Sequence, residues 1–588
     1  MSQRELGDFT TNGRRLAILT GLGASMGIVS GFVALALLRL IGLITHVAYE
    51  GRWGWSLIAP NNHRWGVASI VVPVVGGLIV GILAKYGTDK IRGHGIPEAI
   101  QAILENQSRI EPRVALIKPL ASAITIGTGG PFGAEGPIIM TGGAIGSLVS
   151  QFFPLSPVER RTLLVAGAAG GMSATFGAPV SSVLLAVELL LFEWRPRSLV
   201  PVVVAAAAAD GVRAFFIGTA PIFGTLPSPT IPWSAFAWVV VMGLAAGVVS
   251  GLLTKLVYVI EDAYHRLPIH WMWWPAIGGL FVGVGGLVDP RALGVGYPTI
   301  RMLGAGHLLW TAAITLFLVK AAIWILSLSS GTSGGVLAPL LLLGGALGTI
   351  LSPLLPGHMT GAWATLGMAA MLGGTMRSPF TATIFAMETT HNWNLLLPVL
   401  IASVAGTVIT VLWIPRSILT EKLARRGVHV AREYAAHQLE GQAAHEIMVP
   451  KHETQTAAAT MPVREMARRI EVAPDASHRS YPVVDREGEV MGVVYRSQIL
   501  SRSQGVVADI MQPAHAVGMW ERVRAVVETM VRDDLRELVV RNRGGDWVGW
   551  LPREEVFKTW KRALAEEEHR QATFSVPWRR SSRRAPNC

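Results

Sequence analysis

The chain has 588 residues, of which 51% are hydrophobic and only 15% are charged, and its mean hydropathy is +0.43. Soluble globular chains carry about 25% charged residues, so this composition excludes an ordinary soluble enzyme, and the single cysteine excludes a disulfide framework. The net charge of +12 does not predict nucleic-acid binding, because residues 421–588 hold 50 charged side chains and the first 420 residues hold only 40. We therefore expect a membrane domain followed by a soluble C-terminal part.

Several apolar stretches in the first 420 residues are long enough to cross a bilayer as a helix, which takes about 20 residues. Residues 1–14 are polar and basic, and with the basic C-terminal tail they place both ends of the chain in the cytoplasm, by the positive-inside rule. We expect a multi-pass protein of the inner cell membrane. The clearest stretches are 16–38, 67–84, 199–209 with its flanks, 233–256 and 395–412.

An internal repeat divides the membrane part into halves of about 15–217 and 233–413. Residues 137–150 match residues 339–352 at an offset of 202, and Glu188 matches Glu388 at an offset of 200. The two glutamates are expected to be structural partners where the halves meet, with Lys320 paired to one of them. The residues alone do not determine whether the halves are inverted.

Three glycine-rich motifs lie in this part: Gly93-His-Gly-Ile-Pro97, Gly133-Ala-Glu-Gly-Pro137 and Gly334-Gly-Val-Leu-Ala-Pro339. Each ends in proline, a favoured first residue of a helix, and its glycines leave backbone N–H groups open. Three such helix N-termini converging on one cavity would bind an anion with the positive ends of their dipoles.

The motifs, their order and the repeat resemble those of the CLC chloride channel and transporter family over about residues 15–425. The resemblance implies an all-α polytopic membrane protein with two inverted structural repeats of tilted and broken helices. It also implies a homodimer in the lipid bilayer with one pore per subunit. Such a protein is not an enzyme and needs no cofactor or metal; chloride is its transported ligand.

By this resemblance Glu135 is the gate. Its ionised carboxylate is held beside the backbone N–H groups of the motifs and competes with the anion for them. The alternative is that Glu135 only stabilises the dipole of its own helix. His94 occupies the position where the family usually has a serine. It acts there either as a neutral hydrogen-bond donor or as a pH-sensitive ligand. The chloride-binding residues implied are His94, Gly95, Ile96, Glu135, Gly136, Val336, Leu337 and Ala338.

Two departures from the family pattern bear on the mechanism. Leu189 occupies the position of a second, inner glutamate that takes up protons in many exchangers, which leaves Glu135 and Glu193 as proton-pathway candidates. Pro415 occupies the position of the tyrosine that closes the intracellular side. These departures favour passive, channel-like conduction, with a proton-coupled chloride antiporter as the alternative. A magnesium transporter is a more distant alternative, and it should show clustered membrane carboxylates.

The C-terminal part contains two similar β-α-β-type units, 445–502 and 505–562, which resemble a tandem CBS pair and predict a cytoplasmic α/β module. In the nucleotide-binding pattern of such pairs only Glu555 keeps a carboxylate for the ribose, because Gln498 and two other residues depart from it. We therefore favour a dimerising or gating scaffold over an adenine-nucleotide sensor. The basic residues 563–588 are expected to be disordered, with anionic lipid rather than nucleic acid as their partner.

Overall fold

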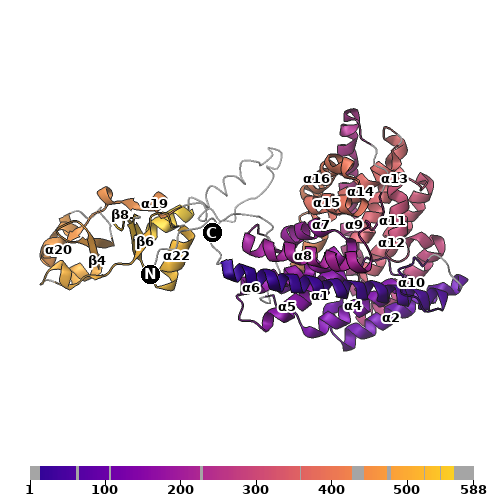
Figure 1. Ribbon diagram of the computed structural model, residues 1–588, viewed down its shortest axis with the longest axis horizontal. Coiled ribbons are helices and arrows are strands. Elements are labelled where there is room, and N and C mark those ends of the chain that lie inside the picture. The colour runs from indigo at the N-terminus through magenta and orange to yellow at the C-terminus, as the bar shows by residue number, and fades with distance from the viewer. Residues whose placement is uncertain are drawn as a thin grey trace, which may run out of the picture. The chain divides into compact units, whose positions relative to one another are not determined.

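The computed structural model describes residues 13–60, 65–104, 108–191, 193–225, 230–357, 359–426, 443–472, 479–502, 504–521, 523–542 and 544–561. The chain forms two compact units that divide between residues 433 and 434 (Figure 1). Most of the predicted N-terminal segment 1–14 and the predicted disordered tail 563–588 lie outside the described residues.

The first unit is entirely helical in the residues that are described. All five predicted spanning stretches are helical, in α1, α2, α8, α9 and α16, and eight described segments are long and apolar enough to cross a membrane. Figure 1 shows the long helix α1 running across α4, α6 and α8, which it contacts. The first half contains α1 (Gly13–Thr45), α2 (Val71–Tyr86), α3 (Ile96–Leu104), α4 (Pro112–Gly127), α5 (Glu135–Gln151), α6 (Pro157–Phe176), α7 (Pro179–Leu185) and α8 (Pro196–Phe216). The second contains α9 (Phe236–His265), α10 (Trp274–Val288), α11 (Tyr297–Gly304), α12 (Trp310–Ser329), α13 (Leu337–Leu351), α14 (Thr360–Met376), α15 (Pro379–Thr390) and α16 (Leu396–Trp413), and α17 (Ile418–Arg425) follows.

The repeat seen in the sequence is a repeat of packing. Gly142 of α5 meets Gly167 of α6, where a Cβ on Gly142 would lie 2.2 Å from the carbonyl oxygen of Gly167. Gly344 of α13 meets Gly367 of α14 in the same way, at 2.3 Å. Because only glycine permits this backbone approach, the matching glycines mark the same helix–helix contact in each half.

The two halves are inverted, as the family resemblance implied. Helices α2 and α10 are equivalent in the repeat, and they pack antiparallel: Gly77 lies against Pro275, while Gly279 lies against Pro73. A reciprocal antiparallel contact between equivalent helices requires a two-fold axis across them. Such an axis gives the two halves opposite orientations in a membrane.

Glu188 and Glu388 join the halves through a reciprocal pair of helix caps. The carboxylate of Glu188 accepts hydrogen bonds from the amides of Phe380 (3.3 Å) and Thr381 (2.9 Å), at the start of α15. The carboxylate of Glu388 accepts from the amides of Val180 (2.9 Å) and Ser181 (2.8 Å), at the start of α7. Both are therefore structural, because a carboxylate satisfies the open N–H groups of a helix N-terminus.

The expected pairing of Lys320 with one of these glutamates is wrong. Lys320 Nζ instead donates to the carbonyl oxygens of Ala292 (2.8 Å) and Gly294 (3.0 Å), in the loop before α11. Lys118, its counterpart in the first half, donates to the carbonyls of Ile91 (2.7 Å) and Gly93 (2.6 Å), before α3. The buried ammonium groups are satisfied by backbone carbonyls that turn inward in these loops.

The second unit is an α/β module with two four-stranded sheets, of order β1-β8-β7-β6 and β2-β3-β4-β5. The predicted α/β character of the C-terminal part is therefore confirmed. The strands are β1 (Val449–Pro450), β2 (Ala457–Ala458), β3 (Ser480–Val484), β4 (Val490–Tyr495), β5 (Gln512–Pro513), β6 (Ala516–Gly518), β7 (Glu537–Arg541) and β8 (Trp547–Pro552). The helices include α19 (Ala444–Ile447), α20 (Val463–Val472), α21 (Arg496–Ser501) and α22 (Val523–Arg532).

The two sheets do not coincide with the sequence units 445–502 and 505–562. Strand β1, from residues 445–502, pairs with β8 of residues 505–562. Strand β5, from residues 505–562, pairs with β4 of residues 445–502. Each sheet therefore receives a short strand from the other unit. Two-residue strands carry too little side-chain pattern to specify their partner, so this exchange could not be read from the sequence.

Candidate functional site

The three glycine motifs meet at one place inside the helical unit. Gly133 and Gly335 exchange backbone hydrogen bonds of 3.3 and 2.9 Å, and the amide of Gly93 donates to the carbonyl of Thr332 at 3.0 Å. Helices α3, α5 and α13 begin next to these contacts, one or two residues before the prolines. The predicted convergence of three helix N-termini is therefore present.

Glycine is required in these motifs because the backbones approach closely. A Cβ on Gly136 would lie 1.9 Å from the carbonyl oxygen of His94, and a Cβ on Gly95 would lie 2.3 Å from that of Gly136. Gly95 also has a φ of +89°, a conformation that other residues rarely adopt. The loop before α3 is thus pressed directly onto the start of α5.

Glu135 lies in the middle of this cluster, fully buried as the first residue of α5. Its Oε1 accepts a hydrogen bond of 3.1 Å from the amide of Ala338, on the first turn of α13. Its Oε2 has no hydrogen-bond partner among the described residues. Gly133 and Gly335 flank the carboxylate so closely that a Cβ on either would collide with it. The side chain therefore occupies a narrow slot between the N-termini of α5 and α13.

This arrangement makes Glu135 a tethered anion at a site built from helix N-termini. The first N–H groups of a helix have no partner within the helix, and the dipoles of α5 and α13 both place positive ends here. A free anion would use the same donors only after the carboxylate moves away. Lys320 and Tyr297 also interact electrostatically with this carboxylate.

The residues expected to bind chloride all lie in this cluster, but the amides of Gly95 and Ala338 are already engaged. The amide of Gly95 donates to Oε2 of Glu98 at 2.8 Å. His94 is buried, and its Nδ1 has no partner among the described residues. Their assignment as chloride ligands stays a prediction. The remaining members, at the starts of α3, α5 and α13, are Ile96, Glu135, Gly136, Val336, Leu337 and Ala338.

Glu98 is a buried carboxylate beside this cluster that the sequence reading missed. Its Oε1 lies 2.8 Å from Nζ of Lys422 and 3.7 Å from a guanidinium nitrogen of Arg426, both contributed by α17 or the residue after it. Its place three residues after Gly95 is the spacing of a capping residue at a helix start, a signal that could have identified it. The ion pair with Lys422 connects α17 to the loop that carries His94.

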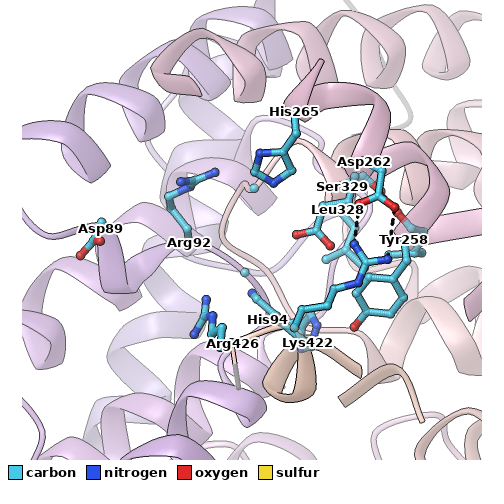
Figure 2. Close-up of a pocket in the computed structure, with 15 residues that line it drawn as sticks. Asp89, Arg92, His94, Tyr258, Asp262, His265, Leu328, Ser329, Lys422 and Arg426 are labelled. Carbon is cyan, nitrogen blue, oxygen red and sulfur yellow. Dashed lines mark hydrogen bonds and ion pairs between the residues drawn. The ribbon is translucent and has the colours of Figure 1, made fainter. Parts of the chain in front are cut away.

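One face of the cluster opens into a cavity of about 430 Å³, which we call the α17 cavity (Figure 2). Figure 2 shows Arg92, His94, Lys422 and Arg426 around one side of it and Tyr258 and Asp262 on the other. Asp262 forms an ion pair with Arg425. The lining holds four basic residues and three acidic ones, so its charges nearly balance.

Tyr258 supplies a tyrosine to the α17 cavity from a helix where none was expected. Pro415 stands at the expected tyrosine position, but the hydroxyl of Tyr258, on α9, donates to the carbonyl of Ile418 at the start of α17. The guanidinium of Arg425 lies 4.7 Å from the centre of its ring. Tyr258 is 160 residues from Ile418 in the chain, so sequence reading could not identify it.

The inverted repeat provides a fourth glycine motif, Gly294-Val-Gly-Tyr-Pro298, which corresponds to residues 93–97 at an offset of 201. It lines a second cavity of about 400 Å³, which we call the α11 cavity. Because the halves are inverted, equivalent loops face opposite sides of the unit. The α17 and α11 cavities therefore lie toward opposite sides of the helical unit.

The other predicted site residues lie outside the cluster. The Oε1 of Glu193 lies 3.0 Å from Arg161 and accepts a hydrogen bond of 2.6 Å from the Ser198 hydroxyl, and Arg195 lies 3.6 Å from the other oxygen. Glu555 is paired with Lys558 at 2.5 Å. Glu193 thus meets two arginines at the start of α8, which leaves its proton role a prediction.

A cavity of about 180 Å³ in the C-terminal module holds the buried residue Glu537. Burial raises the pKa of Glu537, and hydrogen bonds from Tyr495 and Ser480 only partly oppose this shift. Burial, together with the charge of Glu537, raises the pKa of Tyr495 to about 12.

Within the ranges that the structure describes, no group of three His, Cys, Asp or Glu side chains could hold a metal ion.

Comparisons with known proteins identify relatives of this chain. A family model described as voltage gated chloride channel matches residues 76–411. The H(+)/Cl(−) exchange transporter ClcA of Klebsiella pneumoniae is 31% identical over 406 residues, which is 64% of this chain and 84% of the relative. The X-ray crystal structure of a slow cyanobacterial Cl−/H+ antiporter has a TM-score of 0.62 and 20% identity, and covers 71% of this chain and 99% of its own. The crystal structure of a eukaryotic CLC transporter has a TM-score of 0.58 and 21% identity, and covers 92% of this chain and 98% of its own. At these identities the two structures support the fold.

Proposed function

The chain belongs to the CLC family of voltage gated chloride channels and related anion transporters, and we propose that it is a proton-coupled chloride antiporter gated by Glu135. We further propose a homodimer in the inner cell membrane, with one pore per subunit and both chain ends in the cytoplasm. The curated relative is named as an H(+)/Cl(−) exchange transporter. This name favours exchange over the passive conduction that the sequence alone suggested.

One observation carries the proposal: the Glu135 carboxylate occupies the meeting point of α5 and α13. One oxygen accepts a hydrogen bond from Ala338, and the other has no partner among the described residues. An ionised carboxylate held there blocks the anion donors. A proton on it removes the charge that attracts it to the helix N-termini, so the side chain can leave and an anion can take its place. Proton binding and anion passage then alternate at one group.

The α17 and α11 cavities give chloride a route to this group from both sides. His94 and the amides at the starts of α3 and α13 are the proposed chloride ligands. A weakly hydrated halide suits such a site, because backbone N–H groups bind it without a strong cation and release remains fast.

Passive chloride conduction is the second candidate, favoured by Leu189 and Pro415. Leu189 is fully buried and cannot accept a proton, and Glu193 is engaged by two arginines. Neither position therefore supplies a free carboxylate for a proton route. Nothing in the described residues supports the magnesium alternative.

The test is a reversal-potential measurement on the purified protein in planar bilayers under combined chloride and pH gradients. An antiporter reverses between the chloride and proton equilibrium potentials, whereas a passive channel reverses at the chloride potential whatever the pH. Glu135→Gln should retain chloride current and lose its dependence on the pH gradient. Glu193→Gln should weaken coupling if Glu193 carries protons, and it should leave the reversal potential unchanged if its role is to bind Arg161 and Arg195.

The C-terminal module is proposed to be a scaffold for assembly or gating. Its small cavity holds the carboxylate of Glu537, which repels phosphate, and Glu555 is paired with Lys558. Both features disfavour an adenine nucleotide. A thermal-shift titration of the full chain with ATP, AMP and buffer should show no nucleotide-dependent stabilisation.

A further inference from the structure

The starts of α1, α6 and α8 lie on one side of the helical unit. Gly23 of α1 lies against Pro201 of α8. The next such contact is that of Gly27 with Ala205, so the two helices run parallel. Arg15, near the start of α1, forms an ion pair with the glutamate in the first turn of α6. All three helices therefore begin on the same side.

This side carries an excess of positive charge. Six arginines and two glutamates lie in or next to the first turns of the three helices, which gives a net charge of +4. The segments that hold them are residues 14–15, 152–161 and 193–197. Both glutamates are already paired with arginines, Glu159 with Arg15 and Glu193 with Arg161. The carboxylates on this side therefore leave most of the positive charge uncompensated.

Two of these arginines, Arg160 on α6 and Arg197 on α8, have no partner for their charge. Among the described residues neither forms an ion pair, and the Nε of each is buried without a hydrogen-bond partner. Each side chain is partly exposed. The pair between Arg161 and Glu193 joins the two helix starts that carry them. A half-buried guanidinium keeps its remaining N–H groups available for an acceptor that the chain itself does not supply.

Large apolar side chains are exposed beside these arginines. Phe152 and Phe153, between α5 and α6, are 83% and 45% exposed, and Trp194, next to Arg195, is 58% exposed. Tryptophan is favoured at the level of lipid headgroups, and phenylalanine inserts at the boundary between headgroups and acyl chains. Arginines with such neighbours at the starts of apolar helices are therefore typical of a membrane interface.

We propose that Arg160, Arg161, Arg195 and Arg197 form a binding surface for the headgroups of anionic phospholipids, which we call the α6–α8 basic surface. A guanidinium donates two parallel hydrogen bonds to a phosphate, and the acyl chains of the lipid cover the exposed aromatic side chains. A soluble phosphate would bind the arginines but leave those side chains in water, so a lipid fits both features.

The inference goes beyond the proposed transport activity, and only the choice of leaflet rests on the proposed orientation of the chain. With the start of α1 in the cytoplasm, the α6–α8 basic surface faces the cytoplasmic leaflet. Anionic lipids give that leaflet its negative surface potential, which attracts arginines close to the membrane.

The affinity lost with each arginine can be stated. A basic side chain near an anionic membrane surface contributes about 1 kcal/mol, which corresponds to about fivefold in affinity. Replacing Arg160 and Arg197 together by glutamine should therefore weaken lipid binding about 25-fold. Lysine at both positions keeps the charge and should retain most of the binding, although it cannot donate two parallel hydrogen bonds.

The first experiment follows thermal unfolding of the full chain in uncharged detergent micelles, titrated with phosphatidylglycerol. The lipid should raise the midpoint temperature, because a ligand of the folded state stabilises it. Phosphatidylcholine, which has no net charge, and glycerol phosphate, which has no acyl chains, should not. The double variant Arg160→Gln, Arg197→Gln should need about 25-fold more phosphatidylglycerol for the same rise.

A matched control removes two positive charges elsewhere on the helical unit. Lys85 and Lys255 are exposed lysines without a carboxylate partner among the described residues, and each lies over an aromatic ring. The double variant Lys85→Gln, Lys255→Gln should respond to phosphatidylglycerol as the unaltered chain does. An equal response in the arginine double variant would overturn the proposal.

Three other outcomes would also overturn it. Stabilisation by glycerol phosphate alone would assign the arginines to a soluble anion. A change in the fraction of dimer in the arginine double variant, with an unaltered lipid response, would identify the surface as a contact between subunits. The third uses the unaltered chain and holds even if the variant does not fold: the effect of phosphatidylglycerol should shrink between about 0.1 M and about 1 M salt, where the Debye length falls from about 10 Å to about 3 Å. An effect that salt leaves unchanged would exclude the charge of the arginines as its cause.

A second experiment locates the lipid on the unaltered protein. A photoactivatable phosphatidylglycerol in nanodiscs should form adducts within residues 152–161 and 193–203, and the arginine double variant should lose them. Adducts confined to other parts of the chain would refute the surface.

These results are independent of the proposed function. The arginine double variant should keep the reversal potential of the unaltered chain, since neither arginine belongs to the Glu135 cluster. A protein that responds to phosphatidylglycerol but carries no chloride would refute the proposed transport and leave the surface. A protein that exchanges chloride for protons without any response to the lipid would refute the surface alone.

Discussion

The slot that holds the Glu135 carboxylate predicts the effect of adding a single methyl group. A Cβ on Gly133 would lie 1.8 Å from Oε2 and 2.3 Å from Cδ of Glu135, and these are its nearest neighbours. Gly335 closes the other side, where a Cβ would lie 2.6 Å from the same Cδ. In Gly133→Ala the carboxylate must therefore leave the slot.

Leaving the slot costs the carboxylate its hydrogen bond to the amide of Ala338. A hydrogen bond to a charged group contributes about 1.5–3 kcal/mol, so occupancy of the slot should fall roughly ten- to hundredfold. The variant should conduct chloride faster than the unaltered chain and move fewer protons per chloride. Chloride efflux and pH change, recorded together in proteoliposomes, measure both quantities.

Two comparisons make this prediction specific. Gly211→Ala adds a methyl group where no atom lies within 4 Å, so it should transport normally. In a Glu135→Ala background the colliding atoms are gone, so Gly133→Ala should have little further effect, which is the non-additivity expected of two residues in contact. Normal coupling in Gly133→Ala, or an undiminished effect in the Glu135→Ala background, would refute the reasoning.

Three further predictions concern stability. Glu188→Ala leaves the amide and hydroxyl of Thr381 without their acceptor, which costs about 1–3 kcal/mol for each buried group. The midpoint temperature of unfolding in detergent should therefore be well below that of the control Glu193→Ala. Equal midpoints would contradict the capping role. Lys422→Met leaves Glu98 as a buried charge and should lower the free energy of unfolding by up to about 3–5 kcal/mol. Adding Glu98→Gln to the same chain should recover much of this loss. Additive losses in the double variant would argue against the ion pair. In the C-terminal module, burial raises the pKa of Glu537, so the stability linked to its protonated form is present at low pH and is lost as pH rises through the folded-state pKa. Hydrogen-exchange protection of residues 537–552, corrected for intrinsic exchange, should fall over that range and become pH-independent in Glu537→Gln; an unchanged slope in that variant would exclude Glu537 as the source.

The sequence by itself determined the division into a membrane part and an α/β part, five of the apolar helices, the repeat and the place of Glu135 at the start of a helix. These features depend on local composition and on short motifs, which the chain carries wherever it folds. The antiparallel packing of α2 on α10, the carbonyl partners of Lys320 and the exchange of β1 and β5 were decided only by the tertiary structure. So were the positions of Glu98, Tyr258 and Tyr297 around the Glu135 cluster and the two cavities. Each of these contacts joins groups distant in sequence, or depends on which way a loop turns its carbonyls and amides. The physical reason is that side-chain periodicity selects helices and buried faces, whereas the packing of the whole chain selects which faces, loops and polar atoms meet.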